Sequence, residues 1–99
     1  MQNQYKNSTF AKYAYKHIKS LEPTWTNSKT SAQWKSSLEQ YAFPVIGDTP
    51  VSDVSRPQIL EILEPIWYEK TETADRVRRR IGIILDAAMT DDLRTERNP

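Results

Sequence analysis

The amino-acid sequence predicts an all-α protein. Only two glycines occur in 99 residues, which is too few for the tight turns of an all-β fold. Apolar residues recur at helical spacing in four segments, and prolines stand at the edges of these segments. Because a chain of this length buries one core, we expect a single domain over residues 1–99, ordered from about residue 8 to residue 90.

A first amphipathic helix is expected from about Thr9 to Ser20, because its apolar residues follow the i, i+3, i+4, i+7 spacing of one buried face. The opposite face carries three lysines: Lys12, Lys16 and Lys19. Such a row is usually a solvated face, with contacts to a nucleic-acid backbone as the alternative. His17 falls on the apolar arc. We expect a core histidine there rather than a metal ligand, since the chain has no cysteine and no second histidine.

A second helix is expected from about Ser28 to Ala42, after the cap candidates Thr26 and Asn27. Its outward face forms a polar row, which consists of Lys29, Gln33, Ser36 and Gln40. Lys35 lies close to the apolar edge of the same helix. One charge among several neutral hydrogen-bonding groups suits contacts with phosphates and base edges, and an ordinary solvated face is the alternative.

The connection after the second helix is expected to be extended. Residues Phe43 to Val54 begin with the sequence FPVIGD and contain two prolines and a glycine, which interrupt helical hydrogen bonding. The apolar residues of this connection are expected to cover the core, and they are Val45, Ile46, Val51 and Val54.

A third helix is expected to begin at Ser55, because Ser55 and Gln58 have the spacing of a capping box. Pro57 lies in the first turn, where proline is well tolerated. Pro65 is expected to break or kink this helix near Leu63. Residues 66–68 are then expected to form a further short turn.

A fourth helix is expected from near Thr71 to about Thr90. Its apolar residues lie along one face and are Ala74, Val77, Ile81, Ile84, Leu85 and Ala88. Four arginines lie within residues 76–80. At about 100° per residue, Arg76 and Arg80 lie about 40° apart and point away from the apolar arc, with Thr73 and Ile83 beside them.

The four arginines are expected to have different roles. Arg76 and Arg80 face outward together, and like charges at this spacing oppose helix stability unless an anion binds. Arg79 points further toward solvent. Arg78 falls near the margin of the apolar face, where we expect a buried or partly buried ion pair with an acid of residues 41–75. A solvated face is the alternative for the outward-facing arginines.

Charge is unevenly distributed along a chain whose net charge is only +1. Residues 1–40 contain six lysines and two acids, and residues 41–75 contain two basic residues and seven acids. Residues 76–99 contain six arginines and four acids. Without cysteine there is no disulfide, and no apolar stretch approaches the roughly 20 residues of a membrane span. We expect a cytoplasmic protein that needs no metal or other cofactor.

The three tryptophans, Trp25, Trp34 and Trp67, are expected in the core or at its edge. Trp25 is the best candidate among them to touch a sugar or phosphate. Asp91 and Asp92 fall in an expected fraying tail and suggest no acid–base chemistry.

Several short motifs occur in a characteristic order: Phe43-Pro44-Val45-Ile46-Gly47-Asp48, Pro50-Val51, Thr73-Ala74-x-Arg76-x-Arg78-x-Arg80-Ile81, Leu85-Asp86-x-Ala88 and Arg97-Asn98-Pro99. An aromatic helix and a Trp-containing helix precede them. No single motif is specific, but the ordered set resembles the core-binding domain of phage and genomic-island integrases, which are tyrosine recombinases. The resemblance covers residues 9–99.

This resemblance implies a SAM-like bundle of four or five helices that clamps one face of the recombination core site. Family members carry their tyrosine nucleophile in a separate C-terminal domain, so this domain is expected to be non-catalytic and to be the middle part of a longer protein. The implied partners are double-stranded attachment-site DNA and other recombinase protomers, with a monomer in isolation. The implied setting is a bacterial or phage-encoded protein acting at the nucleoid.

The residues expected to contact DNA come from the second and fourth helices: Lys29, Gln33, Ser36, Lys35, Thr73, Arg76, Arg79 and Arg80. The alternative function is a helical protein-interaction module whose partner is a recombinase protomer or a directionality factor. Ile83 and Met89, which are apolar residues outside the buried stripe, motivate this alternative. A free-standing enzyme has almost no support, since no nucleophile, base and anion hole can be assembled from these residues.

Overall fold

The computed structural model describes residues 8–27 and 29–91. Its helices are α1 (Phe10–Leu21), α2 (Lys29–Ser37), α3 (Phe43–Ile46), α4 (Arg56–Trp67) and α5 (Thr71–Thr90). A π-helical segment, Leu38–Ala42, joins α2 to α3, and short 3₁₀ turns cover Glu22–Thr24 and Val51–Asp53. No strand is formed within the described ranges, so the predicted all-α class is confirmed.

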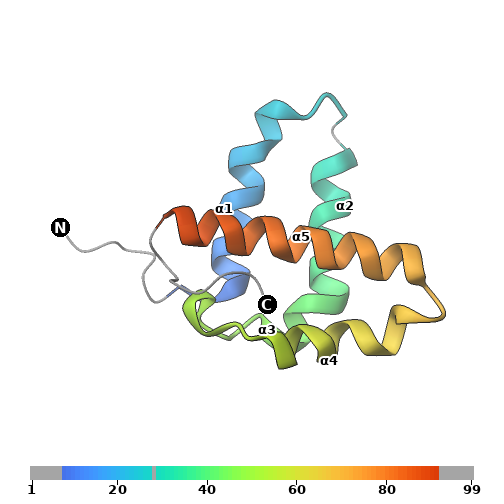
Figure 1. The fold of residues 1–99 in the computed structure, drawn as a ribbon. Coiled ribbons are helices and arrows are strands. Elements are labelled where there is room, and N and C mark those ends of the chain that lie inside the picture. Colours follow the sequence, from blue (N-terminus) through green and yellow to red (C-terminus); the bar gives the residue numbers. More distant parts are fainter. Residues whose placement is uncertain (1–7, 28, 92–99) are drawn as a thin grey trace.

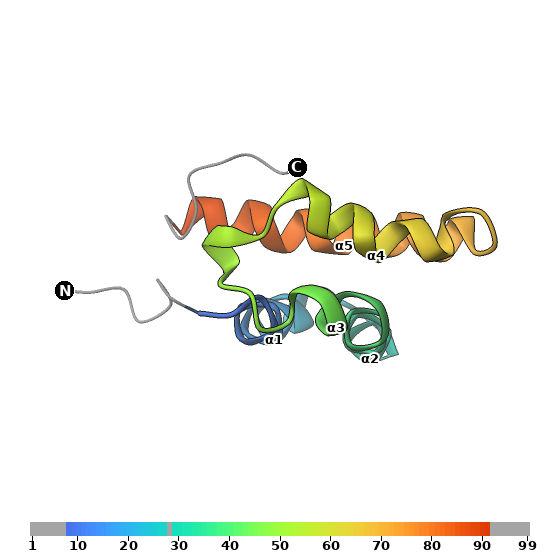
Figure 2. The ribbon, with the colours of Figure 1, turned by 90° about the horizontal axis from the view of Figure 1, so that it is seen from below.

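The helices form two layers. In Figure 2, α1, α2 and α3 lie in one layer while α4 and α5 lie in the other. Figure 1 shows α5 crossing over both α1 and α2. The core fills the space between the layers, and its largest fully buried side chains are Phe10, Tyr13, Ile18, Leu38, Ile46, Val51, Val77, Ile81, Ile84 and Leu85. The apolar arc of α5 faces this core, so the arginines of α5 emerge from the remaining part of its circumference.

Two sequence signals give the helix boundaries correctly. The predicted range of the fourth helix, from Thr71 to Thr90, is that of α5, and all six of its predicted apolar residues are buried. The capping box at the start of α4 is formed, with the Ser55 backbone N–H donating to Gln58 Oε1 at 3.0 Å. At the start of α2, Asn27 Oδ1 accepts from a backbone N–H at 2.8 Å, whereas Ser28 lies outside the described residues.

The extended connection predicted over residues 43–54 is wrong for its first four residues. Phe43–Ile46 form α3, although Pro44 cannot donate a backbone hydrogen bond. The π-helical segment ahead of it provides the physical reason: the Phe43 N–H reaches back five residues to the Leu38 carbonyl. This wider turn accommodates the missing donor, which would interrupt an ordinary α-helix.

The remainder of the connection is tied to the start of α1. The Phe10 N–H donates to the Thr49 carbonyl at 2.8 Å, and the Ala11 N–H donates to the Gly47 carbonyl at 3.1 Å. A Cβ at Gly47 would lie 2.6 Å from the Phe43 carbonyl oxygen. Glycine is therefore required by a close backbone approach at the end of α3.

Of the break or kink predicted at Pro65, the break does not occur, because α4 continues through Pro65 to Trp67. A proline removes the donor to the carbonyl four residues earlier, that of Glu61. Both residues are exposed, so water can satisfy this carbonyl. Trp67 is 41% exposed and lies outside the core, contrary to expectation. None of the helices in the described ranges combines the length and apolarity that a bilayer crossing requires.

Candidate nucleic-acid interface

Arg80 joins the two helices on which the predicted contact residues lie. Its Nη1 donates to Ser37 Oγ at 2.7 Å and to the Gln33 carbonyl at 3.3 Å, and its guanidinium lies 5.5 Å from the centroid of the Trp34 ring. All three partners belong to α2. The predicted outward direction of Arg80 is therefore wrong, because its side chain lies against α2. The same contact brings the polar row of α2 next to the arginines of α5.

The other three arginines pair with acidic residues of their own helix. Asp75 accepts from Arg78 at 2.8 Å and lies 3.1 Å from Arg79 Nε, and these guanidiniums hold the pKa of Asp75 below its ordinary value. Arg76 lies 3.6 Å from Glu72. The expected ion pair of Arg78 is present, but the side chain of Arg78 is 52% exposed, so its expected burial is wrong.

Residues 72–80 carry four arginines against two acids and so have a net charge of +2. Burial and the neighbouring charges of Arg76 and Arg79 lower the pKa of Arg80, which nevertheless stays charged at neutral pH. Burial is the larger cause, and the like charges of Arg76 and Arg79 add to it. An anion bound between them would relieve the repulsion between these like charges.

Along α2, the predicted contact residues differ in accessibility. Lys29, Gln33 and Ser36 are exposed, as the helical spacing predicted. Lys35 is half-buried, and its Nζ lies 3.8 Å from Glu22 at the end of α1. Thr73 on α5 is also half-buried. The structure thus leaves the outward row of α2 accessible, while Lys35 is engaged with α1.

Tryptophan packing supports α2 from the side of α1. The rings of Trp25 and Trp34 lie 5.4 Å apart, centroid to centroid. Trp34 is buried and Trp25 is half-buried at the edge of the core, as the sequence predicted for both. Glu22 also accepts a hydrogen bond from Ser31 Oγ at 2.5 Å. These contacts hold α2 against the end of α1 independently of its contacts with α5.

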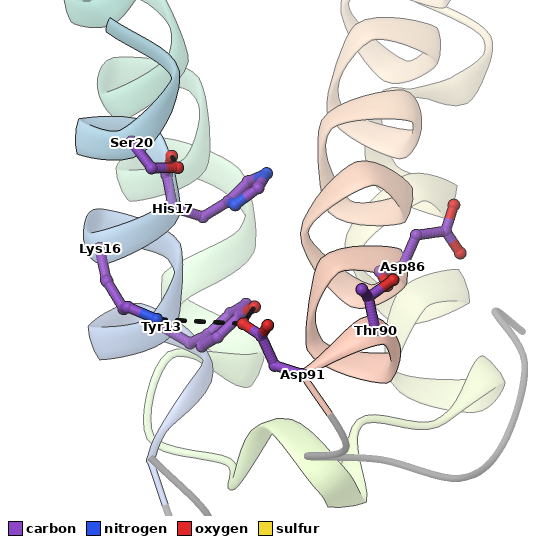
Figure 3. Close-up of polar contacts among 7 residues, drawn as sticks. All are labelled: Tyr13, Lys16, His17, Ser20, Asp86, Thr90 and Asp91. Atoms are coloured by element: carbon purple, nitrogen blue, oxygen red, sulfur yellow. Dashed lines mark hydrogen bonds and ion pairs between the residues drawn. The ribbon is translucent and has the colours of Figure 1, made fainter. Parts of the chain in front are cut away.

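A polar cluster fastens the end of α5 to α1 (Figure 3). The buried Tyr13 donates its hydroxyl to Asp91 at 2.6 Å, and Lys16 Nζ lies 3.9 Å from the same carboxylate. Burial and the hydrogen bond to Asp91 raise the pKa of Tyr13. The expectation that Asp91 belongs to a fraying tail is therefore wrong, whereas Asp92 lies outside the described residues.

His17 stacks on the Tyr13 ring at a centroid distance of 6.3 Å. It is half-buried, and burial is the main cause that lowers its pKa. His17 thus lies at the edge of the core. Within residues 8–27 and 29–91, no group of three or more histidine, cysteine or acidic side chains could hold a metal ion.

An apolar groove of about 780 Å³ lies between α4 and α5, and it was not predicted from the sequence. Its exposed apolar side chains are Leu60, Trp67 and Tyr68, and Gly82 contributes to its α5 wall. Helical spacing could have placed Leu60 and Trp67 on one side of α4, had the helix not been expected to end before Trp67. The groove lies along the α4–α5 pair, whereas Arg80 faces α2.

The fold and the α2–α5 surface place the chain among small all-α domains that present a basic helix to their surroundings. The family model of the phage integrase central domain matches residues 10–99, and the chain belongs to this family. The resemblance indicated by the ordered motifs is thereby confirmed. The chain is a recombinase-related integrase domain.

Two individual proteins are similar to this chain. Prophage integrase IntZ of Escherichia coli (strain K12) is 35% identical over 75 residues, which cover 76% of this chain and 18% of that protein. The chain therefore spans about a fifth of the length of this relative. The solution NMR structure of protein Nmul_A0922 from Nitrosospira multiformis has a TM-score of 0.86 and 41% identity, covering 92% of this chain and 86% of that chain.

Proposed function

We propose that this domain binds the core-site DNA duplex of a phage-type tyrosine recombinase and clamps one face of it. The observation that carries the proposal is the junction at Arg80, where the polar row of α2 meets the basic turns of α5. The accessible groups of this surface are Lys29, Gln33, Ser36, Arg76 and Arg79, with Thr73 at its edge. Arginine and lysine suit phosphates, while the amide and the hydroxyls can also reach base edges.

Electrostatics supports this surface despite the low net charge of the chain. The ion pairs of Arg76 and Arg79 are exposed, and such pairs contribute little to stability. Exchanging a carboxylate for a DNA phosphate therefore costs the fold little. The mutual repulsion of the arginines further favours binding of a polyanion.

Catalysis is proposed to lie elsewhere in the parent protein. Tyrosine recombinases carry their nucleophile in a separate domain, and this chain spans only 18% of the length of prophage integrase IntZ. The domain would then supply DNA affinity and orientation, and the proposed partners are attachment-site DNA and other protomers of the same recombinase.

The test is binding of the isolated domain to a fluorescent core-site duplex at several salt concentrations. With four to six phosphate contacts, log affinity should fall with log salt at a slope of about −4 to −5, and the affinity should be micromolar or weaker. Arg76→Ala should make the slope less steep by about 0.9 and weaken binding about eightfold at 0.1 M salt. A slope near zero for the wild type would refute the proposed function.

Arg56→Ala provides a matched control, since Arg56 lies at the start of α4 beside the apolar groove. It removes the same charge as Arg76→Ala but from outside the proposed surface. The salt slope should therefore stay unchanged in this variant. Equal effects of the two variants would show that net charge alone, rather than the α2–α5 surface, governs binding.

A second candidate function, association with another copy of this chain, is favoured by the apolar groove. Glu61 and Glu64 are exposed on α4, and the exposed face of α1 is basic through Lys12, Lys16 and Lys19. A second copy therefore offers a helix of complementary charge. Analytical ultracentrifugation without DNA tests this candidate: a stable dimer that Leu60→Glu abolishes supports it, and a monomer at all concentrations refutes it.

A further inference from the structure

Arg80 is bound differently from the other arginines of α5. Arg76, Arg78 and Arg79 pair with carboxylates of their own helix, whereas Arg80 is held by neutral groups of α2. These groups lie 43 and 47 residues earlier in the chain. A contact between distant helices is suited to fixing their relative placement.

We propose that Arg80 is a positioning residue that fixes α2 against α5, so that Lys29 and Arg76 face the same DNA duplex. This inference rests on the proposed DNA-binding function and assigns Arg80 a role different from that of the phosphate-binding arginines. Arg80 acts through α2 and is itself engaged before any DNA is bound.

The geometry of the guanidinium supports this role. One nitrogen, Nη1, reaches both the Ser37 hydroxyl and the Gln33 carbonyl, while the guanidinium carbon lies 5.5 Å from the Trp34 ring centroid. These are two hydrogen bonds and one cation–π contact to successive turns of a single helix. A lysine at position 80 would keep the charge, but its Nζ is one bond nearer the backbone than Nη1 and so would not reach both oxygens from the same place.

The place of the contact along α2 is also informative. Ser37 is the last residue of α2, and the helix widens to the π-helical segment directly after it. Glu22 and Trp25 hold the earlier turns of α2 from the side of α1. Arg80 contacts α2 from the other layer, next to the place where the hydrogen-bond pattern of the helix changes. Core packing of Trp34 and Leu38 would keep the domain folded without it.

A double-mutant cycle between Arg80 and Lys29 tests the proposal. Lys29 lies one turn before Gln33, whereas the contacts of Arg80 are with Gln33, Trp34 and Ser37, so coupling between Lys29 and Arg80 in DNA binding must pass through α2. In the wild type, Lys29→Ala should weaken binding about eightfold at 0.1 M salt, the effect of one lost phosphate contact. In the Arg80→Lys background, the same substitution should weaken binding less than twofold.

If the effects of Lys29→Ala and Arg80→Lys on binding add in the double variant, the proposal is overturned, because Arg80 then does not act through the placement of Lys29 on α2. An unchanged affinity of Lys29→Ala in an otherwise wild-type domain would overturn it as well. Arg76→Lys is the matched control: it conserves charge on the same face of α5, and its effect should add to that of Lys29→Ala.

A measurement without DNA separates this proposal from the proposed function. In Arg80→Lys, the backbone amide chemical shifts of residues 29–37 should change while the circular dichroism spectrum stays helical. Arg76→Lys should leave these shifts unchanged. Shifts that are the same in Arg80→Lys and the wild type would overturn the positioning role, whereas a wild-type domain without affinity for the duplex would refute the DNA-binding function instead.

Discussion

Replacing Asp75 by asparagine should strengthen DNA binding. The Asp75 carboxylate lies 2.8 Å from Arg78 and 3.1 Å from Arg79, so its single negative charge is shared between two guanidiniums. Arg78 borders the apolar groove, whereas Arg79 belongs to the proposed DNA surface. Asp75→Asn should therefore free one additional phosphate-binding group.

The magnitude follows from counterion release. One additional phosphate contact makes the slope of log affinity against log salt steeper by about 0.9, which corresponds to about eightfold tighter binding at 0.1 M salt. Fluorescence anisotropy with a core-site duplex measures both quantities. Asp86→Asn is the control, because it makes the same charge change on α5 but lies 11 residues, or about 16 Å, further along the helix. At 0.1 M salt the Debye length is about 10 Å, so its effect should be small.

Two results would refute this reasoning. An unchanged slope and affinity in Asp75→Asn would mean that Arg79 does not reach a phosphate. Equal strengthening by Asp75→Asn and Asp86→Asn would mean that overall charge acts, rather than release of a particular arginine. Thermal unfolding of both variants checks that the helix is retained.

Two further predictions concern the fold. Tyr13→Phe should lower the stability at neutral pH by about 2 kcal/mol through loss of the hydrogen bond to Asp91. Because the pKa of Tyr13 is raised above 10.0 in the folded protein, its contribution to the free energy of unfolding should be complete below pH 10 and decrease as the pH rises above 10. Thermal unfolding between pH 7 and 11 should therefore show a smaller loss of stability at high pH in Tyr13→Phe than in the control Tyr41→Phe. Gly47→Ala should destabilise the domain by about 1–3 kcal/mol, because the added Cβ would meet the Phe43 carbonyl oxygen. The control Gly82→Ala, in the middle of α5, should not destabilise it. Equal midpoints of urea unfolding for the two variants would contradict this prediction.

Helix positions could be predicted where the signal depends on many residues or on a complete local motif. The boundaries of α5 follow from six apolar residues spaced over 20 positions, and all six are buried. The start of α4 follows from the capping box of Ser55 and Gln58, which needs no contact outside its own turn. Both signals are local, so folding of the remaining chain does not alter them.

The two errors in the helices both involve proline. A proline removes one hydrogen-bond donor, but the sequence does not show whether the structure can compensate for that loss. At Pro44 the compensation is the wider π-helical turn, and at Pro65 it is an exposed carbonyl on the solvent side of α4. Both solutions depend on how the helix is placed relative to the core and the solvent.

Helical spacing predicts which side chains of α2 are exposed, but not the contacts that α2 makes with α5. Helical spacing gives the direction of Lys29 and Gln33 around α2, and these side chains are exposed as predicted. It cannot show that α5 crosses α2 in the other layer, so the Arg80 contact with Ser37 could not be found. The same limitation applies to Asp91, whose partner Tyr13 lies 78 residues earlier.

The distribution of partners around the arginines explains how a chain of net charge +1 can present a basic surface. Two carboxylates, Glu72 and Asp75, pair with Arg76, Arg78 and Arg79, and these exposed pairs weaken in salt. Arg80 is different, because its partners are a hydroxyl, a carbonyl and an aromatic ring, none of which cancels its charge. It contributes a positive charge at the α2–α5 junction in addition to the positioning role proposed for it. A variant that keeps this charge but loses the contact, Arg80→Lys, therefore separates the electrostatic contribution of Arg80 from its structural one.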